Sequence, residues 1–329
     1  MLELAARVAQ GDTAALARAC RLVDERVEGY RALLHELFPL SGRARTIGIT
    51  GAPGVGKSTL TDALVAALRA QGQRVGVIAI DPSSPFSGGA LLGDRIRMQR
   101  HALDEEVFVR SLGSRGAHGG LSRSAADTLR LLSAWGAATV LLETVGVGQA
   151  EFDFLGVVES AVLVVMPGAG DDVQASKAGI LEAADLVVLN KADRPGADAA
   201  ESELRIGLSL GELSISPSLS HRPSVAPSAA AGCGWSKPVL RTVANTGEGI
   251  ATMMQALDAH AAWLRETDAG RAQAAGRVQR SIVGFLREVA SEALLSQAGP
   301  LLNELVDLVS ARLLDPYEAS ERLLREVAR

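Results

Sequence analysis

The chain has 329 residues, of which 47% are hydrophobic and 22% charged, and its net charge is −5 at pH 7. This composition suits a globular protein with a sizeable core, and the negative balance argues against a general role in nucleic-acid binding. No apolar run is long enough for a membrane span, the first residues lack a secretory pattern, and two lone cysteines, at 20 and 233, favour a reducing cytoplasm.

Residues 2–38 are predicted to be helical. Apolar positions such as Leu16, Cys20 and Val23 recur at steps of four and three, which places them on one helical face. The run Gly11-Asp12-Thr13 divides this stretch into two helices, with Asp12 or Thr13 as the cap of the second.

Short apolar runs then alternate with helical segments from residue 46 to about 195. The predicted strands are 47–50, 75–80, 107–109, 139–142, 161–166 and 186–189, and a last strand at 239–243 precedes a helix at 248–266. Most of these runs are β-branched or leucine-rich throughout, as strands buried on both faces of a parallel sheet are. The pattern predicts a doubly wound α/β domain with a mostly parallel sheet.

Two regions depart from this alternation. Residues 206–236 are rich in serine and proline and are predicted to be a flexible exposed loop. Residues 270–329 are helical in pattern and carry an apolar face. This face is expected to pack against a partner subunit. The predicted organisation is an N-terminal helical arm at 1–42, a central domain at 43–267 and a C-terminal helical dimerisation arm at 268–329.

The most informative motif is G-x-x-x-x-G-K-[ST], placed between the strand at 47–50 and the helical pattern that follows. Its residues and the next one are Gly51, Ala52, Pro53, Gly54, Val55, Gly56, Lys57, Ser58 and Thr59. The glycines let backbone N–H groups surround phosphate oxygens, and the helix adds its positive end. We expect Lys57 to reach the β- and γ-phosphates and Ser58 to bind Mg²⁺. The motif predicts a P-loop NTPase fold.

A second motif, Asn190-Lys191-Ala192-Asp193, directly follows the strand at 186–189. The Asp193 carboxylate can accept hydrogen bonds from guanine N1–H and the N2 amine, which adenine does not offer in that arrangement. Asn190 is expected to tie the loop together, and the Lys191 stem to pack on the purine face. Alone the motif also fits an ordinary polar turn, but downstream of a P-loop it favours GTP over ATP.

Acidic residues at strand ends predict the rest of a Mg²⁺ site. Glu143 ends the apolar run at 140–142, and Gly146 just beyond it has an N–H suited to the γ-phosphate. Asp81 ends the strand at 75–80, at the edge where open α/β sheets bind ligands. Asp94 lies in a glycine-rich segment of switch-loop character, although a helix cap explains it nearly as well.

Another glycine- and acid-rich run, from Pro167 to Lys177, follows the strand at 161–166. The residues alone do not separate a conformational loop near the nucleotide from a solvated turn.

Together these motifs resemble the MeaB/ArgK family of methylmalonyl-CoA mutase-associated GTPases, of the SIMIBI class, which is related to the human methylmalonic aciduria type A protein. The segments that carry the resemblance are 48–59, 81–95, Glu143-Thr144-Val145-Gly146-Val147-Gly148-Gln149, 167–172, 190–193 and Asp315-Pro316-Tyr317. The resemblance implies a homodimeric GTPase that gates cofactor loading and protects or reactivates an adenosylcobalamin-dependent acyl-CoA mutase.

The resemblance also implies roles for single residues. Ser58, Asp81, Asp94 and Glu143 would surround Mg²⁺ beside GTP or GDP. Hydrolysis would depend on Lys57, Asp94, Glu143 and Lys177, and a further switch would include Asp171, Asp172, Gln174 and Lys177. Gln149 is a candidate for orienting water. The family has Ser-Ala where this chain has Val243-Ala244, followed by Asn245, and we expect backbone donors to read guanine there.

Three alternative functions share the nucleotide site. A nickel-insertion GTPase would need a histidine- or cysteine-rich tract, and the five histidines here are scattered. Part of the family has carried an arginine/ornithine-transport kinase label, and a kinase would need an acceptor pocket and a base, for which the sequence shows no motif. The third alternative is a regulatory nucleotide sensor that binds GTP and hydrolyses it negligibly.

Overall fold

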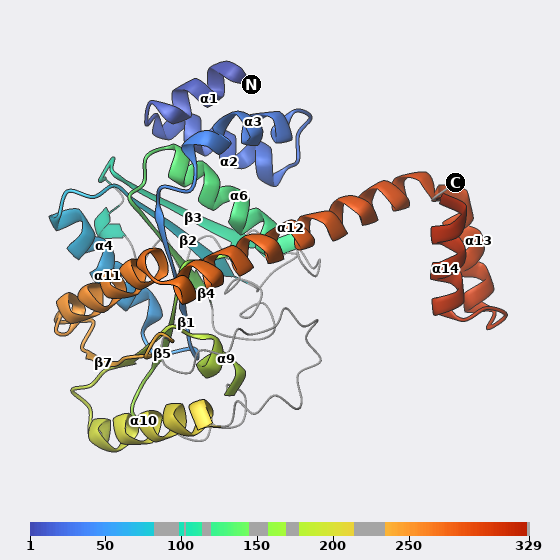
Figure 1. The fold of residues 1–329 in the computed structure, drawn as a ribbon. Coiled ribbons are helices and arrows are strands. Elements are labelled where there is room, and N and C mark those ends of the chain that lie inside the picture. Colours follow the sequence, from blue (N-terminus) through green and yellow to red (C-terminus); the bar gives the residue numbers. More distant parts are fainter. Residues whose placement is uncertain are drawn as a thin grey trace. The chain divides into compact units, whose positions relative to one another are not determined.

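The computed structural model describes residues 1–81, 99–101, 103–113, 120–144, 157–168, 178–213 and 234–327. They belong to two compact units, Met1–Ala274 and Ala275–Arg329 (Figure 1). The sheet and every residue of the candidate site lie in the first unit.

The centre of the first unit is a seven-stranded sheet in the order β3-β2-β4-β1-β5-β6-β7 (Figure 1). The strands are β1 (Arg45–Thr50), β2 (Val75–Asp81), β3 (Val107–Gly113), β4 (Thr139–Thr144), β5 (Ser160–Val165), β6 (Leu186–Asn190) and β7 (Val239–Thr242). Each neighbouring pair is parallel. Strands β4, β5 and β6 are buried along their whole length, as their continuous apolar sequences require.

Helices cover both faces of the sheet. The helices that pack on it are α4 (Lys57–Ala70), α6 (Gly120–Ala134), α9 (Ala178–Ala183), α10 (Ala197–Leu213) and α11 (Ile250–Glu266). Side chains alternate across each strand, so Val162 and Val164 of β5 join the core under α4 and α11, whereas Leu163 and Val165 join the core under α9 and α10. The predicted doubly wound α/β P-loop fold is confirmed.

The N-terminal helices pack over α6. They are α1 (Leu2–Ala9), α2 (Thr13–Asp24) and α3 (Tyr30–Leu37), followed by the 3₁₀ turn η1 (Phe38–Leu40). Leu16 and Leu33 are fully buried in the same core as Trp135 and the sheet residue Ile78. The Asp12 side chain accepts a 2.9 Å hydrogen bond from the Ala15 N–H, which confirms Asp12 as the cap of α2.

The predicted loop at 206–236 begins later than its composition indicated. Helix α10 continues to Leu213, because Leu204 is buried and Leu208 partly buried against the apolar core beneath it. Residues 214–233 lie outside the described part of the chain. Residues 234–237 have no regular structure and lead into β7.

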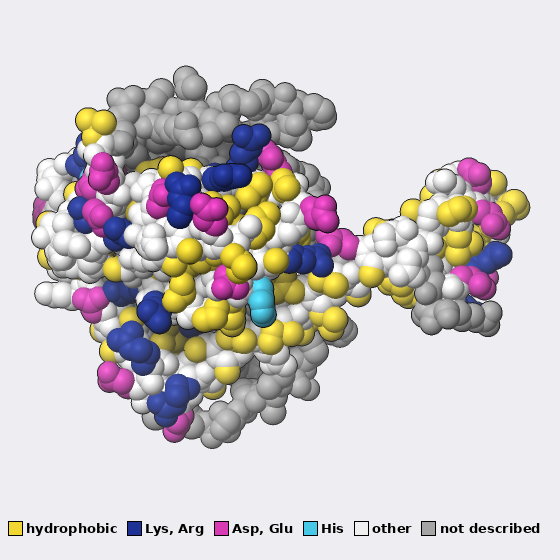
Figure 2. Space-filling view, turned by 90° about the horizontal axis from the view of Figure 1, so that it is seen from above, with side chains coloured by type: hydrophobic (Ala, Val, Ile, Leu, Met, Phe, Trp, Pro, Cys, Tyr) yellow, Lys and Arg dark blue, Asp and Glu magenta, His cyan; other side chains and the backbone are white. Residues whose placement is uncertain are grey.

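The second unit is helical. Helix α12 (Asp268–Gln297) contributes its residues from Ala275 onward, followed by α13 (Gly299–Ser310) and α14 (Pro316–Val327). Pro300 and Pro316 lie in the first turns of α13 and α14, where a helix tolerates proline because the N–H groups there have no partner within the helix. Hydrophobic side chains lie among charged ones on the surface of this unit (Figure 2). None of the described helices is long and apolar enough to cross a membrane.

Candidate nucleotide site

The loop between β1 and α4 approaches two other elements too closely for a side chain at either end. At Gly51, with φ of 146°, an added Cβ would lie 2.1 Å from the Val164 carbonyl oxygen of β5. At Gly56, with φ of 95°, it would lie 2.5 Å from Asn190 Nδ2. Backbone conformation and close approach together therefore require glycine at both positions.

Lys57 is the first residue of α4, and its side chain folds back over the loop. Its Nζ donates to the Gly51 carbonyl at 2.8 Å and to the Ala52 carbonyl at 2.9 Å. The residue is only 7% exposed. The ammonium group therefore lies within the predicted phosphate-binding loop. Because it is shielded from water there, its electrostatic attraction for a bound anion is stronger than at the protein surface.

Ser58 and Glu143 form the second feature of the site. Ser58 Oγ donates to Glu143 Oε1 at 2.5 Å, and Glu143 is buried near the carboxyl end of β4. The next residue, Thr144, donates to Thr50 Oγ1 at 3.1 Å and so ties the ends of β4 and β1 together. A hydroxyl and a carboxylate side by side are the hard oxygen donors that Mg²⁺ prefers, so this pair fits the expected metal.

Asn190, at the end of β6, connects the two motifs. Its Nδ2 donates to the Val55 carbonyl of the P-loop at 2.9 Å. Its Oδ1 accepts from the Ala244 N–H at 3.1 Å and from Thr242 Oγ1 at 3.2 Å. Because the side chain is 2% exposed, these bonds are shielded from water, and they fix the P-loop to the turn after β7.

Lys191 continues from Asn190 with a left-handed backbone, at φ of 57°. Its Nζ donates to the Gly54 carbonyl at 2.6 Å and lies 3.8 Å from Met166 Sδ, just beyond β5. The aliphatic stem therefore reaches across the mouth of the P-loop. Asp193 is exposed in the turn that follows.

The backbone donors expected at Val243-Ala244 are already used within the protein. Val243 N–H donates to the Glu248 carbonyl at 3.0 Å, and Ala244 N–H donates to Asn190 Oδ1. These two bonds close the turn on itself and on Asn190, and the reading of guanine by backbone donors at residues 243–245 stays a prediction. Asn245, the next residue, is exposed.

Several predicted site residues lie outside the described part of the chain. They are Asp94, Gly146, Gln149, Asp171, Asp172, Gln174 and Lys177. Asp81 ends β2 as predicted, at the same edge of the sheet as Glu143, but its side chain is not described. The described residues bring Lys57, Ser58 and Glu143 together, with Asn190 and Lys191 bonded to the same loop.

Sequence reasoning missed Met166 and Thr242, which contact Lys191 and Asn190 of the second motif. Each lies at or just beyond the carboxyl end of a strand, the edge at which open α/β sheets bind ligands, and that position is the signal that would have found them. Among the described residues, no group of three or more His, Cys, Asp or Glu side chains gathers as a metal site.

A glycine loop between the central strand of a parallel sheet and a helix, with Lys57 folded into it and a serine–glutamate pair beside it, defines a P-loop nucleotide-binding domain. The asparagine-anchored loop after β6 places it among the GTPases. The family model described as "Methylmalonyl Co-A mutase-associated GTPase MeaB" matches residues 16–299, and the chain belongs to this family.

Individual relatives agree with this family. A putative GTPase of Pyrococcus horikoshii is 39% identical over 99% of this chain and 98% of its own length. The mitochondrial methylmalonic aciduria type A homolog of Mus musculus is 36% identical over 74% of this chain and 59% of its own length. Among solved structures, a LAO/AO transport system kinase matches with a TM-score of 0.66 and 26% identity, covering 100% of this chain and 97% of the other.

Proposed function

We propose that the chain binds GTP with Mg²⁺ and hydrolyses it to GDP and phosphate. The observation that carries this proposal is the Asn190–Val55 hydrogen bond, because it makes the phosphate loop and the base loop one connected unit. Lys57 binds the phosphates, Ser58 and Glu143 hold Mg²⁺, and Asp193 reads guanine with a backbone donor near Asn245.

Residues whose side chains lie outside the described structure complete the proposed site. Asp81 and Asp94 join the Mg²⁺ ligands, Gly146 contacts the γ-phosphate, and Lys177 supports hydrolysis. We expect intrinsic hydrolysis to be slow, so that a partner protein can set its rate.

The partner that we propose is an adenosylcobalamin-dependent acyl-CoA mutase, methylmalonyl-CoA mutase or a relative. The chain would act as a chaperone in the cytoplasm, gating cofactor loading and protecting or reactivating the mutase. Support comes from the family description and from the relative named for methylmalonic aciduria. We further propose a homodimer held by the C-terminal helices, whose exposed apolar side chains include Ile282 and Leu286.

Base recognition is tested by measuring GTP, ATP and xanthosine triphosphate binding to the wild type and to Asp193→Asn. The wild type should prefer GTP, and the variant should shift toward xanthosine triphosphate, because an amide can donate to the O2 of xanthine where the carboxylate accepted from guanine N2. A variant that keeps its GTP preference would remove Asp193 from base recognition.

The chaperone role is tested with purified methylmalonyl-CoA mutase. The two proteins should co-elute in size-exclusion chromatography, and phosphate release from GTP should be faster in the mixture than in the GTPase alone. No binding and no acceleration would contradict the role. Transfer of the γ-phosphate to arginine or ornithine instead of water would favour the kinase alternative.

A further inference from the structure

The last residues of β1 and β4 form a buried hydroxyl pair. Thr144 Oγ1 donates to Thr50 Oγ1 at 3.1 Å, and the two residues are 5% and 0% exposed. The backbone register between the two strands ends at Ile49 and Glu143. The hydroxyl pair therefore continues the connection between the strands one residue beyond their last backbone pairing, at the carboxyl edge of the sheet.

Both threonines are next in the chain to residues of the candidate site. Thr50 precedes Gly51, the first residue of the P-loop. Thr144 follows Glu143, whose Oε1 accepts from Ser58 Oγ at 2.5 Å. One hydroxyl bond thus joins the residue before the phosphate loop to the residue after the proposed metal-binding carboxylate.

The last two side chains of β4 lie on opposite faces of the sheet, because consecutive residues of a strand alternate between its faces. Glu143 contacts Ser58 of α4, and Leu141 packs in the core beneath the same helix. Leu142 packs in the core beneath α6, so Thr144 points to that face. The end of β4 is therefore held from both sides, by α4 through Glu143 and by β1 through Thr144.

We propose that Thr50 and Thr144 are positioning residues for the metal-binding carboxylate. A shift of the strand end would move Glu143 relative to Ser58, and the bond between the two hydroxyls resists that shift. Groups that orient a metal ligand without touching the ion change the affinity of the site for its metal. This inference deepens the proposed GTPase function and rests on it, because Mg²⁺ is part of that proposal.

The chemistry of a buried pair separates this role from simple stabilisation. Thr144→Val leaves the Thr50 hydroxyl buried without this partner and should lower the urea midpoint. The double variant Thr50→Val/Thr144→Val removes both hydroxyls and should recover much of that loss, since no polar group of the pair is left behind. The bond is broken in both variants, so weakened Mg²⁺ binding should persist in the double variant.

Mg²⁺ binding is measured on the whole chain by calorimetric titration with GDP over a range of Mg²⁺ concentrations. Thr144→Val should raise the Mg²⁺ concentration that gives half of the gain in GDP affinity by roughly three- to tenfold, at or below the lower limit for groups bonded directly to a metal ligand, because the effect passes through the backbone. GDP affinity without Mg²⁺ should stay near the wild-type value. Thr144→Ser keeps a hydroxyl at this position and should behave like the wild type.

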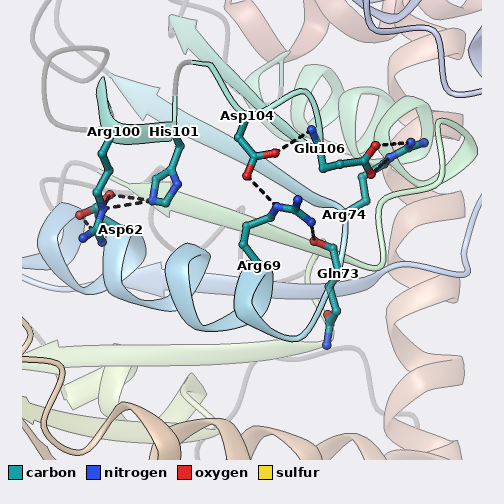
Figure 3. Close-up of polar contacts among 8 residues, drawn as sticks. All are labelled: Asp62, Arg69, Gln73, Arg74, Arg100, His101, Asp104 and Glu106. Atoms are coloured by element: carbon teal, nitrogen blue, oxygen red, sulfur yellow. Dashed lines mark hydrogen bonds and ion pairs between the residues drawn. The ribbon is translucent and has the colours of Figure 1, made fainter.

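Thr139→Val is the matched control at the other end of β4. Thr139 is 2% exposed, and its Oγ1 donates to Gln73 Oε1 at 2.9 Å. Gln73 lies between α4 and β2, and its carbonyl accepts from Arg69 Nη1 at 2.7 Å (Figure 3). The same substitution therefore breaks a buried hydroxyl bond of the same strand, at the amino edge of the sheet. It should lower the urea midpoint and leave the Mg²⁺ requirement at the wild-type value.

Three results would overturn the proposal. They are an unchanged Mg²⁺ requirement in Thr144→Val, an equal increase in Thr139→Val, and an increase in Thr144→Val that disappears in the double variant, since the last two would follow stability and not the bond. A wild type whose GDP affinity does not respond to Mg²⁺ would instead refute the metal site of the proposed function, and the positioning role with it.

Discussion

Asn190 Nδ2 donates a 2.9 Å hydrogen bond to the Val55 carbonyl, which joins two residues 135 positions apart in the chain. Replacing Asn190 by Asp keeps the shape but places an oxygen against that carbonyl. We expect Asn190→Asp to lower the free energy of unfolding by about 1–3 kcal/mol, since buried groups lose their partners. GDP affinity should fall as well, because the P-loop loses its link to the base loop.

Urea denaturation and calorimetric GDP titration measure these two effects. Asn303→Asp makes the same chemical change at an exposed position of α13 and should leave both quantities near the wild-type values. If Asn190→Asp behaved like Asn303→Asp, the bond to Val55 would not be holding the loops together.

The glycines of the P-loop offer a comparison within one turn. A Cβ at Gly51 would meet the Val164 carbonyl at 2.1 Å, whereas one at Gly54, with φ of 80°, would meet no described atom within 4 Å. Gly54→Ala should therefore lose only about 1 kcal/mol, from backbone strain. Gly51→Ala should be far more destabilised or fail to accumulate in folded form, because a backbone atom of β5 must move. Equal denaturation midpoints for the two variants would contradict this reading of the loop.

The contrast between local and distant contacts explains what the sequence could predict. The strands were predictable because runs such as Val187-Val188-Leu189 are buried on both faces, and the P-loop because its chemistry is contiguous. The partners of Asn190 were not, since they depend on how β7 and the P-loop meet in space. Composition misplaced the end of α10, because serines obscured the Leu204 and Leu208 pair that anchors it.

The Arg74 guanidinium holds the pKa of Glu106 below its usual range, through hydrogen bonds of 2.7 and 2.8 Å to its two carboxylate oxygens. A lowered pKa in the folded state stabilises the fold at pH values above the unfolded pKa of about 4.3, and this contribution is lost as the pH falls below that value through the lower folded pKa. We therefore expect Glu106→Gln to flatten the decline of the free energy of unfolding below about pH 5. The effect should be modest, because the Glu106 side chain is 41% exposed.

Arg74→Gln separates this pH effect from packing. Arg74 also lies over the Trp135 ring, 4.6 Å from its centroid, and donates to the Trp135 carbonyl. The variant should show the same flattened pH dependence and an additional loss of stability at every pH. Urea midpoints measured from pH 3 to 7 distinguish the two components, and an unchanged slope in both variants would contradict the assignment.

Burial raises the pKa of the Cys20 thiol to about 12, so at pH 8 only roughly one thiol in ten thousand is the reactive thiolate. In a Cys233→Ser background, the native protein should show no prompt reaction with a disulfide reagent, and one thiol per chain should react after denaturation. Absorbance of the released chromophore gives both numbers. Prompt reaction of the Cys20 thiol in the native protein would mean that α2 readily separates from α6, against which it packs.

The proposed homodimer predicts that the apolar stripe of α12 is covered in solution. Val278, Ile282 and Leu286 are spaced four residues apart and are 60%, 61% and 65% exposed in the single chain, so a charge there would disrupt a subunit contact. Leu286→Arg should convert the dimer to monomers in sedimentation velocity. Ser291→Arg adds the same charge roughly 180° around the helix from Ile282 and should leave the dimer intact. A wild type that sediments as a monomer at micromolar concentration, or equal behaviour of the two variants, would rule out this stripe as the interface.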